Sequence, residues 1–211
     1  SYGKSCLDAV KRGLTRTGAN LLSEDGIAVG AVDFRPILSK IKAMKPGLQV
    51  VYFGGVVTEA SLIKIQMSEL GMKNLYTGVT GIDSETFNTT AKDAAEGSLI
   101  VGKAYIDESS PFVKAYKAGG YKEYYEATGP YAYDAVNLIL EAIKKVGPED
   151  KKKLAQAIRE IEYRGILGVT KFDEFGQTLS GGLNIKVSQD KKWVIWEDSE
   201  YGKGKRSLPG K

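Results

Sequence analysis

A short apolar run that stops at two glycines is the clearest local pattern in this chain. Val50–Phe53 is β-branched or aromatic throughout, Gly54 and Gly55 follow, and a helical pattern starts at Thr58. A run of this length bounded by a turn signal predicts a buried strand. The carboxyl end of such a strand opens onto a ligand crevice in a parallel sheet. An ordinary strand-to-helix turn is the open alternative, since Gly-Gly turns are common.

Helical periodicity and strand-like runs alternate over the first hundred residues. We expect, in order, a helix over 2–17, a strand over 21–29, a helix with Asp33 as its N-cap, the strand at 50–53, a helix over 58–70, and strands over 74–78 and 97–102. Regular alternation of this kind predicts a parallel sheet with helices on its faces. A sheet of this type normally starts with a strand, so we also expect a segment N-terminal to residue 1 to belong to the fold.

The pattern changes after residue 102. Two helices are expected between residues 110 and 146, separated at Thr128-Gly129-Pro130, and the second has its core face at Tyr133, Val136, Leu140 and Ile143. A helix over 151–161, a strand over 168–173 and a hairpin of 184–187 with 193–196 follow. The basic tail at 203–206 is expected to be a frayed terminus.

Composition narrows the function. The 211 residues are 42% hydrophobic and 27% charged, as in an ordinary globular protein, and the net charge is +4. The lysines are spread along helices, which favours solvated faces over a nucleic-acid surface, so no nucleic-acid partner is expected. No apolar stretch is long enough to cross a membrane. No signal peptide is visible, which leaves the compartment open.

The residues of common catalytic sites are scarce. The chain has no histidine and one cysteine, Cys6, on an apolar helix face where a packed thiol is favoured over a nucleophile. A P-loop and a dinucleotide glycine fingerprint are absent, and the paired acids fall in turn-like contexts. We therefore expect a protein that is not an enzyme and uses no metal and no cofactor.

Two tyrosines stand where a ligand could be held. Tyr2 and Tyr131 each lie at a helix start, next to a glycine or a Gly-Pro pair. A helix N-terminus offers free N–H groups that suit a carboxylate, and an aromatic ring would supply an apolar wall. A capping or hinge role for either tyrosine stays open.

A series of motifs, in this order and spacing, resembles the branched-chain amino acid binding proteins. These are the substrate-binding components of ABC transporters, with the type I periplasmic binding fold. The resemblance runs from residue 2 to about residue 196. The motifs are Ser1-Tyr2-Gly3-Lys4, Val32-Asp33-Phe34, Tyr52-Phe53-Gly54-Gly55, Asp93-Ala94-Ala95-Glu96-Gly97, Gly129-Pro130-Tyr131-Ala132-Tyr133-Asp134-Ala135-Val136 and Phe172-Asp173-Glu174-Phe175-Gly176.

The resemblance implies an α/β fold of two parallel-sheet, Rossmann-like lobes joined by a hinge. Residues 1–101 and 178–211 would form the second, C-terminal lobe, nearly complete. Residues 102–177 would form the later half of the first lobe, incomplete. The family's N-terminal half has no counterpart in this sequence, so a fragment or a separate N-terminal piece is expected.

The resemblance also implies a ligand site. The expected ligand-binding residues are Tyr2, Gly55, Val56, Thr80, Asp83 and Tyr131. Val56 replaces a position that is often aromatic in the family, and Thr80 replaces one that is usually an acid pairing with the ligand's α-ammonium group. A buried ammonium without an acid is costly. Either another acid, Asp83 or Glu59, takes over, or the ligand is not an ordinary α-amino acid.

By the same resemblance, the protein would be the solute-binding component of an ABC transporter. It would bind a small amino-acid-like or related metabolite by hinge closure and deliver it to a membrane permease. It would be periplasmic or extracellular after removal of a signal peptide. A lipid anchor is compatible with either location. Self-association or the missing N-terminal half would cover its open faces. The alternatives are a ligand-sensing domain of a regulatory system with the same fold, and a small α/β enzyme.

Overall fold

The chain divides into two compact units. A computed structural model describes residues 2–44, 47–103, 106, 109–122, 125, 128–179 and 182–210. Unit 1 contains residues 1–102 and 184–211, and unit 2 contains residues 103–183. The chain therefore passes from unit 1 to unit 2 after Gly102 and returns after Leu183.

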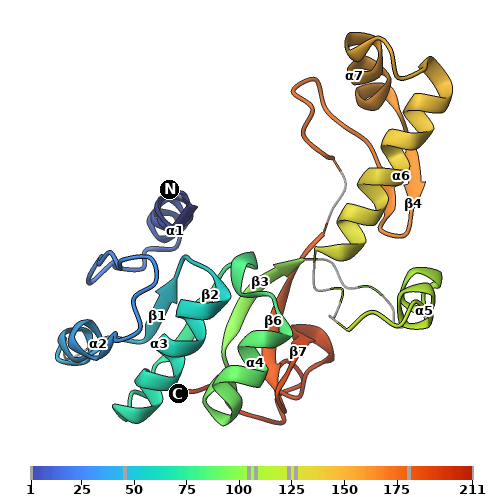
Figure 1. The fold of residues 1–211 in the computed structure, drawn as a ribbon. Coiled ribbons are helices and arrows are strands. Elements are labelled where there is room, and N and C mark those ends of the chain that lie inside the picture. Colours follow the sequence, from blue (N-terminus) through green and yellow to red (C-terminus); the bar gives the residue numbers. More distant parts are fainter. Residues whose placement is uncertain are drawn as a thin grey trace. The chain divides into compact units, whose positions relative to one another are not determined.

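Unit 1 is built on a five-stranded sheet in the order β1-β2-β3-β6-β7 (Figure 1). β1 (Val50–Phe53), β2 (Leu75–Gly78) and β3 (Leu99–Lys103) are parallel. β6 (Leu183–Gln189) and β7 (Lys192–Ile195) form the antiparallel hairpin that the period-two pattern predicts. The apolar run at 50–53 is confirmed as a strand, and it lies at the edge of the sheet.

Three of the helices of unit 1 agree with the sequence pattern, and the fourth, α4, was not predicted. The described helices are α1 (Tyr2–Thr17), α2 (Arg35–Lys42), α3 (Val57–Glu69) and α4 (Glu85–Ala91), with the short 3₁₀ turns η1 (Thr80–Ile82), η2 (Lys92–Ala95) and η3 (Trp196–Asp198). α3 and α4 pack against each other (Figure 1). The side chain of Asp33 accepts a hydrogen bond from the Arg35 N–H at 3.1 Å. The residue that precedes the helix is Phe34, so α2 begins one residue later than expected.

An aromatic stack fixes α4 against the sheet. The ring of Phe87 lies between Tyr76 of β2, at a centroid distance of 6.1 Å, and Trp193 of β7, at 5.3 Å. The indole N–H of Trp193 donates to the Ser84 carbonyl at 3.0 Å, just before α4. Because Phe87 and Tyr76 are buried, this stack joins α4 to two strands and forms the centre of the unit 1 core.

The expected strand over 21–29 is wrong. No strand is assigned there, and Leu21, Leu22 and Val29 are exposed. A strand needs a neighbour for its main-chain hydrogen bonds, and β1 is paired only with β2 among the described strands. The loop's end is held by Gln66 instead: its Oε1 accepts from the Phe34 N–H at 2.6 Å, and its Nε2 donates to the Val32 carbonyl at 2.8 Å.

The C-terminal tail is folded, so the expectation of a frayed terminus is also wrong. The Arg206 guanidinium donates to Asp190 and to Glu96, and Glu96 also accepts from the Tyr201 hydroxyl at 2.6 Å. Burial, together with the Glu96 carboxylate, raises the pKa of Tyr201 to about 12. Gly210 packs against the main chain just before β2. The tail therefore covers the amino ends of the parallel strands.

The described residues of unit 2 form three helices and a small hairpin. These are α5 (Pro111–Ala118), α6 (Gly129–Val146), α7 (Lys151–Glu160), and the antiparallel pair β4 (Tyr163–Gly165) and β5 (Gly168–Thr170). Asp134 of α6 accepts from the Ile166 and Leu167 N–H groups at 3.0 and 2.9 Å and so holds the hairpin turn. The sequence pattern does not indicate β4, which is only three residues long.

The predicted core face of α6 is wrong for unit 2 taken by itself. The buried side chains of α6 include Leu138 and Ala142, whereas Val136 and Leu140 are exposed. α6 packs on α7 and β4, and these contacts use the side of the helix opposite Val136. The expected apolar face is thus present in sequence but uncovered by the described part of unit 2.

Replacing Phe87 with alanine should destabilise unit 1 by about 3–5 kcal/mol, because it removes the middle ring of a buried stack. Urea unfolding followed by tryptophan fluorescence measures this, since both tryptophans, Trp193 and Trp196, lie in unit 1. The control is Val29→Ala, at a side chain of unit 1 that is 99% exposed, which should change stability by less than about 0.5 kcal/mol. Equal effects of the two substitutions would contradict this core.

Candidate functional site

The carboxyl ends of β1 and β2 form one edge of the unit 1 sheet. Phe53 of β1 is in register with Gly78 of β2, so the two strands end side by side. Gly54 and Gly55 follow β1, and the turn η1 follows β2. In open parallel sheets, ligands bind outside this edge.

Glycines allow the main chain of α1 to come into close contact with the main chain just after β1. A Cβ on Gly3 would lie 2.6 Å from the Gly54 oxygen, and one on Gly54 would lie 2.9 Å from the Cys6 Cβ. Any larger residue would force these segments apart. Burial raises the pKa of Tyr52 well above its ordinary value, with Cys6 and Tyr2 adding to the effect. The first turn of α1 therefore packs directly against the edge of the sheet at the end of β1.

A second close approach joins the loop after β1 to the loop after β2. A Cβ on Gly81 would lie 2.4 Å from the Gly55 oxygen and 3.1 Å from the Tyr2 hydroxyl. Tyr2, Gly55 and Gly81 thus lie together, with Val56 and Thr80 next to them in sequence. Tyr2 and Val56 are about half exposed, 48% and 51%. Four of the expected residues, Tyr2, Gly55, Val56 and Thr80, therefore gather at one accessible edge.

Asp83 is engaged inside the protein. The Lys186 ammonium donates to both carboxylate oxygens of Asp83 at 2.9 Å, and the two side chains are only 3% and 11% exposed. Gly102 lies beside the pair, since a Cβ there would fall 2.9 Å from Asp83 Oδ2 and 2.8 Å from Lys186 Cδ. Sequence reasoning missed Lys186, which lies 103 positions from its partner on an otherwise ordinary strand.

Glu59, the other candidate acid, lies in the first turn of α3 and is 8% exposed. Its Oε1 accepts from the Gly30 N–H at 3.3 Å. Its Oε2 is buried and has no hydrogen-bond partner in the described part of the chain. The carboxylate therefore faces the loop that precedes α2.

Tyr131 belongs to unit 2, in the first turn of α6. Its ring lies below the Lys103 ammonium, 5.4 Å from Nζ to the ring centroid. That Tyr131 contacts the same solute as Tyr2 stays a prediction.

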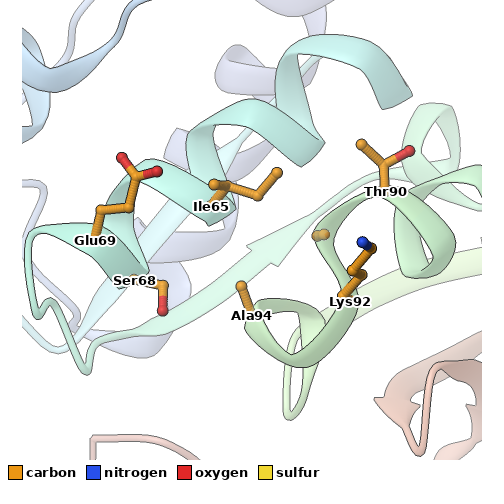
Figure 2. A pocket seen from close by; sticks show the side chains of 7 residues that line it. Ile65, Ser68, Glu69, Thr90, Lys92 and Ala94 are labelled. Atoms are coloured by element: carbon orange, nitrogen blue, oxygen red, sulfur yellow. The ribbon is translucent and has the colours of Figure 1, made fainter.

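A groove between α3, α4 and η2 is lined by none of the expected ligand-binding residues (Figure 2). Its lining residues are Ile65, Ser68, Glu69, Thr90, Ala91, Lys92 and Ala94. Metal-ligating side chains form no group of three or more in the portion of the chain that is described. None of the described helices combines the length and apolarity needed to cross a membrane.

Comparison with known proteins identifies the family. Residues 1–190 match the sequence profile of the family described as "Periplasmic binding protein". The chain belongs to the periplasmic binding protein family. This membership confirms the resemblance drawn from the motifs, and it places the chain among binding proteins rather than enzymes.

The similar proteins include amino acid binding proteins. "Leu/Ile/Val-binding protein homolog 1" of Brucella suis is 31% identical over 204 residues, which cover 95% of this chain and 53% of that protein. The "Leucine-, isoleucine-, valine-, threonine-, and alanine-binding protein" of Pseudomonas aeruginosa is 31% identical over 181 residues, 83% of this chain and 47% of that protein. The chain thus spans about half the length of these relatives.

A solved structure confirms the fold. The crystal structure of a leucine binding protein from Thermotoga maritima has a TM-score of 0.77 and 25% identity to this periplasmic binding protein. The match covers 88% of this chain and 53% of that one. The expected α/β fold with a largely parallel sheet is therefore correct.

Replacing Gly81 with alanine should separate the two loops and destabilise unit 1 by about 1–3 kcal/mol, because the new Cβ meets the Gly55 oxygen, which cannot move cheaply. Gly13→Ala is the matched control. Gly13 lies in α1 with open space around it, so alanine should stabilise the helix by about 0.5–1 kcal/mol. Chemical unfolding of both variants tests this. A Gly81→Ala protein as stable as the unsubstituted chain would contradict the close approach.

Proposed function

We propose that this protein is the solute-binding component of an ABC transporter and that it binds a small amino-acid-like or related metabolite at the carboxyl edge of unit 1. The observation that carries the proposal is the convergence of Tyr2, Gly55 and Gly81 at that edge. The names of the relatives from Brucella and Pseudomonas support a solute of this class.

The edge offers the contacts that a small metabolite needs. The Tyr2 ring is an accessible apolar surface with a hydroxyl at its end, Val56 adds methyl groups, and Thr80 adds a second hydroxyl. Small-molecule sites combine apolar walls with a few placed polar groups. Tyr2, Gly55, Val56 and Thr80 are proposed as ligand contacts of unit 1, and Tyr131 as a contact contributed by unit 2.

Units 1 and 2 are proposed to correspond to the second lobe and to part of the first lobe of the family fold. The chain crosses between them twice, after Gly102 and after Leu183, and these crossings would act as the hinge for closure over the solute. A membrane permease would receive the solute in the periplasm or outside the cell.

A further polypeptide is proposed to cover the apolar surface that the units leave open. The exposed side chains Val136 and Leu140 of α6, and Leu21 and Leu22 in the loop that forms no strand, support this proposal. Either a second copy of the chain or the half of the relatives that the chain does not span would serve.

The 211-residue chain alone should bind its solute weakly. Small-molecule sites bury most of the ligand surface, and the carboxyl edge of unit 1 is only one wall. Calorimetry with leucine, isoleucine and valine should show affinity weaker than micromolar, while NMR titration should shift the amide signals of Gly55 and Gly81. Tyr2→Ala should abolish these shifts. Micromolar affinity of the chain alone would contradict the single-wall account, and an absence of shifts with every small metabolite tested would contradict the proposed function.

A further inference from the structure

We propose that the part of the solute held at the carboxyl edge of unit 1 carries no positive charge, so that the site prefers an aliphatic carboxylate without an α-ammonium group over the amino acid of the same shape. This inference rests on the proposed function and specifies the ligand class of that site. It follows from the burial of the two candidate acids, Asp83 in its pair with Lys186 and Glu59 beside the loop that precedes α2.

An ammonium group transferred from water into a protein site needs an acid or several acceptors around it, because an unpaired buried charge is strongly unfavourable. The loop after β2 contains one acid, Asp83. Both of its oxygens receive hydrogen bonds from Lys186, and the pair is nearly fully buried. Its charge is therefore already balanced within the protein.

The arrangement around the pair keeps Asp83 in place. Gly102 leaves just enough room for the Asp83 carboxylate and the Lys186 stem, with a missing Cβ 2.9 and 2.8 Å from them. Turning Asp83 toward a solute would leave the Lys186 ammonium buried without its counter-ion. Removing one partner of a buried ion pair leaves the other charge buried and uncompensated, which strongly destabilises the protein. Asp83 thus acts as the counter-ion of Lys186.

Glu59 does not supply the missing charge either. Its carboxylate is covered by protein, with one oxygen on the Gly30 N–H and the other buried. A solute at the surface formed by Tyr2 and Val56 would have to open that cover to reach it.

Apart from Asp83, the described loops that follow β1 and β2 carry no charged side chain. The Tyr2 and Thr80 hydroxyls can each donate to a ketone or carboxylate oxygen and can accept from a neutral donor. A 2-oxo acid or an unsubstituted carboxylic acid satisfies them without bringing a positive charge. An α-amino acid would bring one, and the described loops after β1 and β2 offer it no carboxylate besides the Asp83 that Lys186 engages.

Three solutes that differ only at the α-carbon test the proposal. Leucine has an ammonium there, 4-methyl-2-oxopentanoate a ketone, and 4-methylpentanoate two hydrogens. Each is titrated into the ¹⁵N-labelled 211-residue chain, with the amides of Gly55 and Gly81 as reporters and those of Gly97 and Gly210, near the opposite edge, as internal controls. The ketone and the unsubstituted acid should bind roughly tenfold or more tightly than leucine.

Thr80→Glu should reverse this order, because it places a carboxylate at the edge and should raise leucine affinity roughly tenfold or more. Thr89→Glu is the matched control: it adds the same charge at an exposed position of α4 and should leave the order unchanged. Thr80→Asp is the second variant, with a shorter side chain, should glutamate disturb the fold.

The outcomes separate the two proposals. Preference for the acids without an ammonium, reversed by an acid at position 80, supports the inference. Preference of the unsubstituted chain for leucine overturns the inference and leaves the solute-binding function standing. If none of the three solutes nor any other small metabolite moves the Gly55 and Gly81 signals, the proposed function fails and this inference fails with it.

Discussion

Contact between main-chain segments at glycine positions is the constraint on which the candidate site depends. α1 meets β1 through Gly3 and Gly54, and the loops after β1 and β2 meet through Gly55 and Gly81. At these distances a Cβ would push the segments apart, and Tyr2 would no longer lie beside the loop of Thr80. The Gly-Gly end of β1 is thus more than a turn, because it sets how closely α1 and η1 approach the sheet edge.

The parts of the fold that depend on local pattern were predictable from sequence. The helix over 2–17 has the predicted limits, and the strand at 50–53 needs only its apolar run and its glycines. The failures are places where a partner decides the outcome. Residues 21–29 have a strand-like composition but no strand beside them, and Val136 lies on an apolar helix face that the described part of unit 2 leaves uncovered.

The candidate site shows the same division. Tyr2, Gly55 and Thr80 could be placed at the sheet edge from motifs and spacing, since each follows or adjoins a predicted element. The engagement of Asp83 by Lys186 could not be, because the two residues come from distant elements and nothing in the local sequence marks the pair. The pair engages Asp83 inside unit 1, so the acid content of the loop after β2 does not by itself indicate the ligand class.

The most direct test of the account is a crystal structure of the protein with its bound solute. The account predicts solute density at the carboxyl ends of β1 and β2, in contact with the Tyr2 ring and the Thr80 hydroxyl, with the Asp83–Lys186 pair intact. Density elsewhere, for example in the groove lined by Ile65 and Thr90 (Figure 2), with the edge near Tyr2 empty, would contradict it.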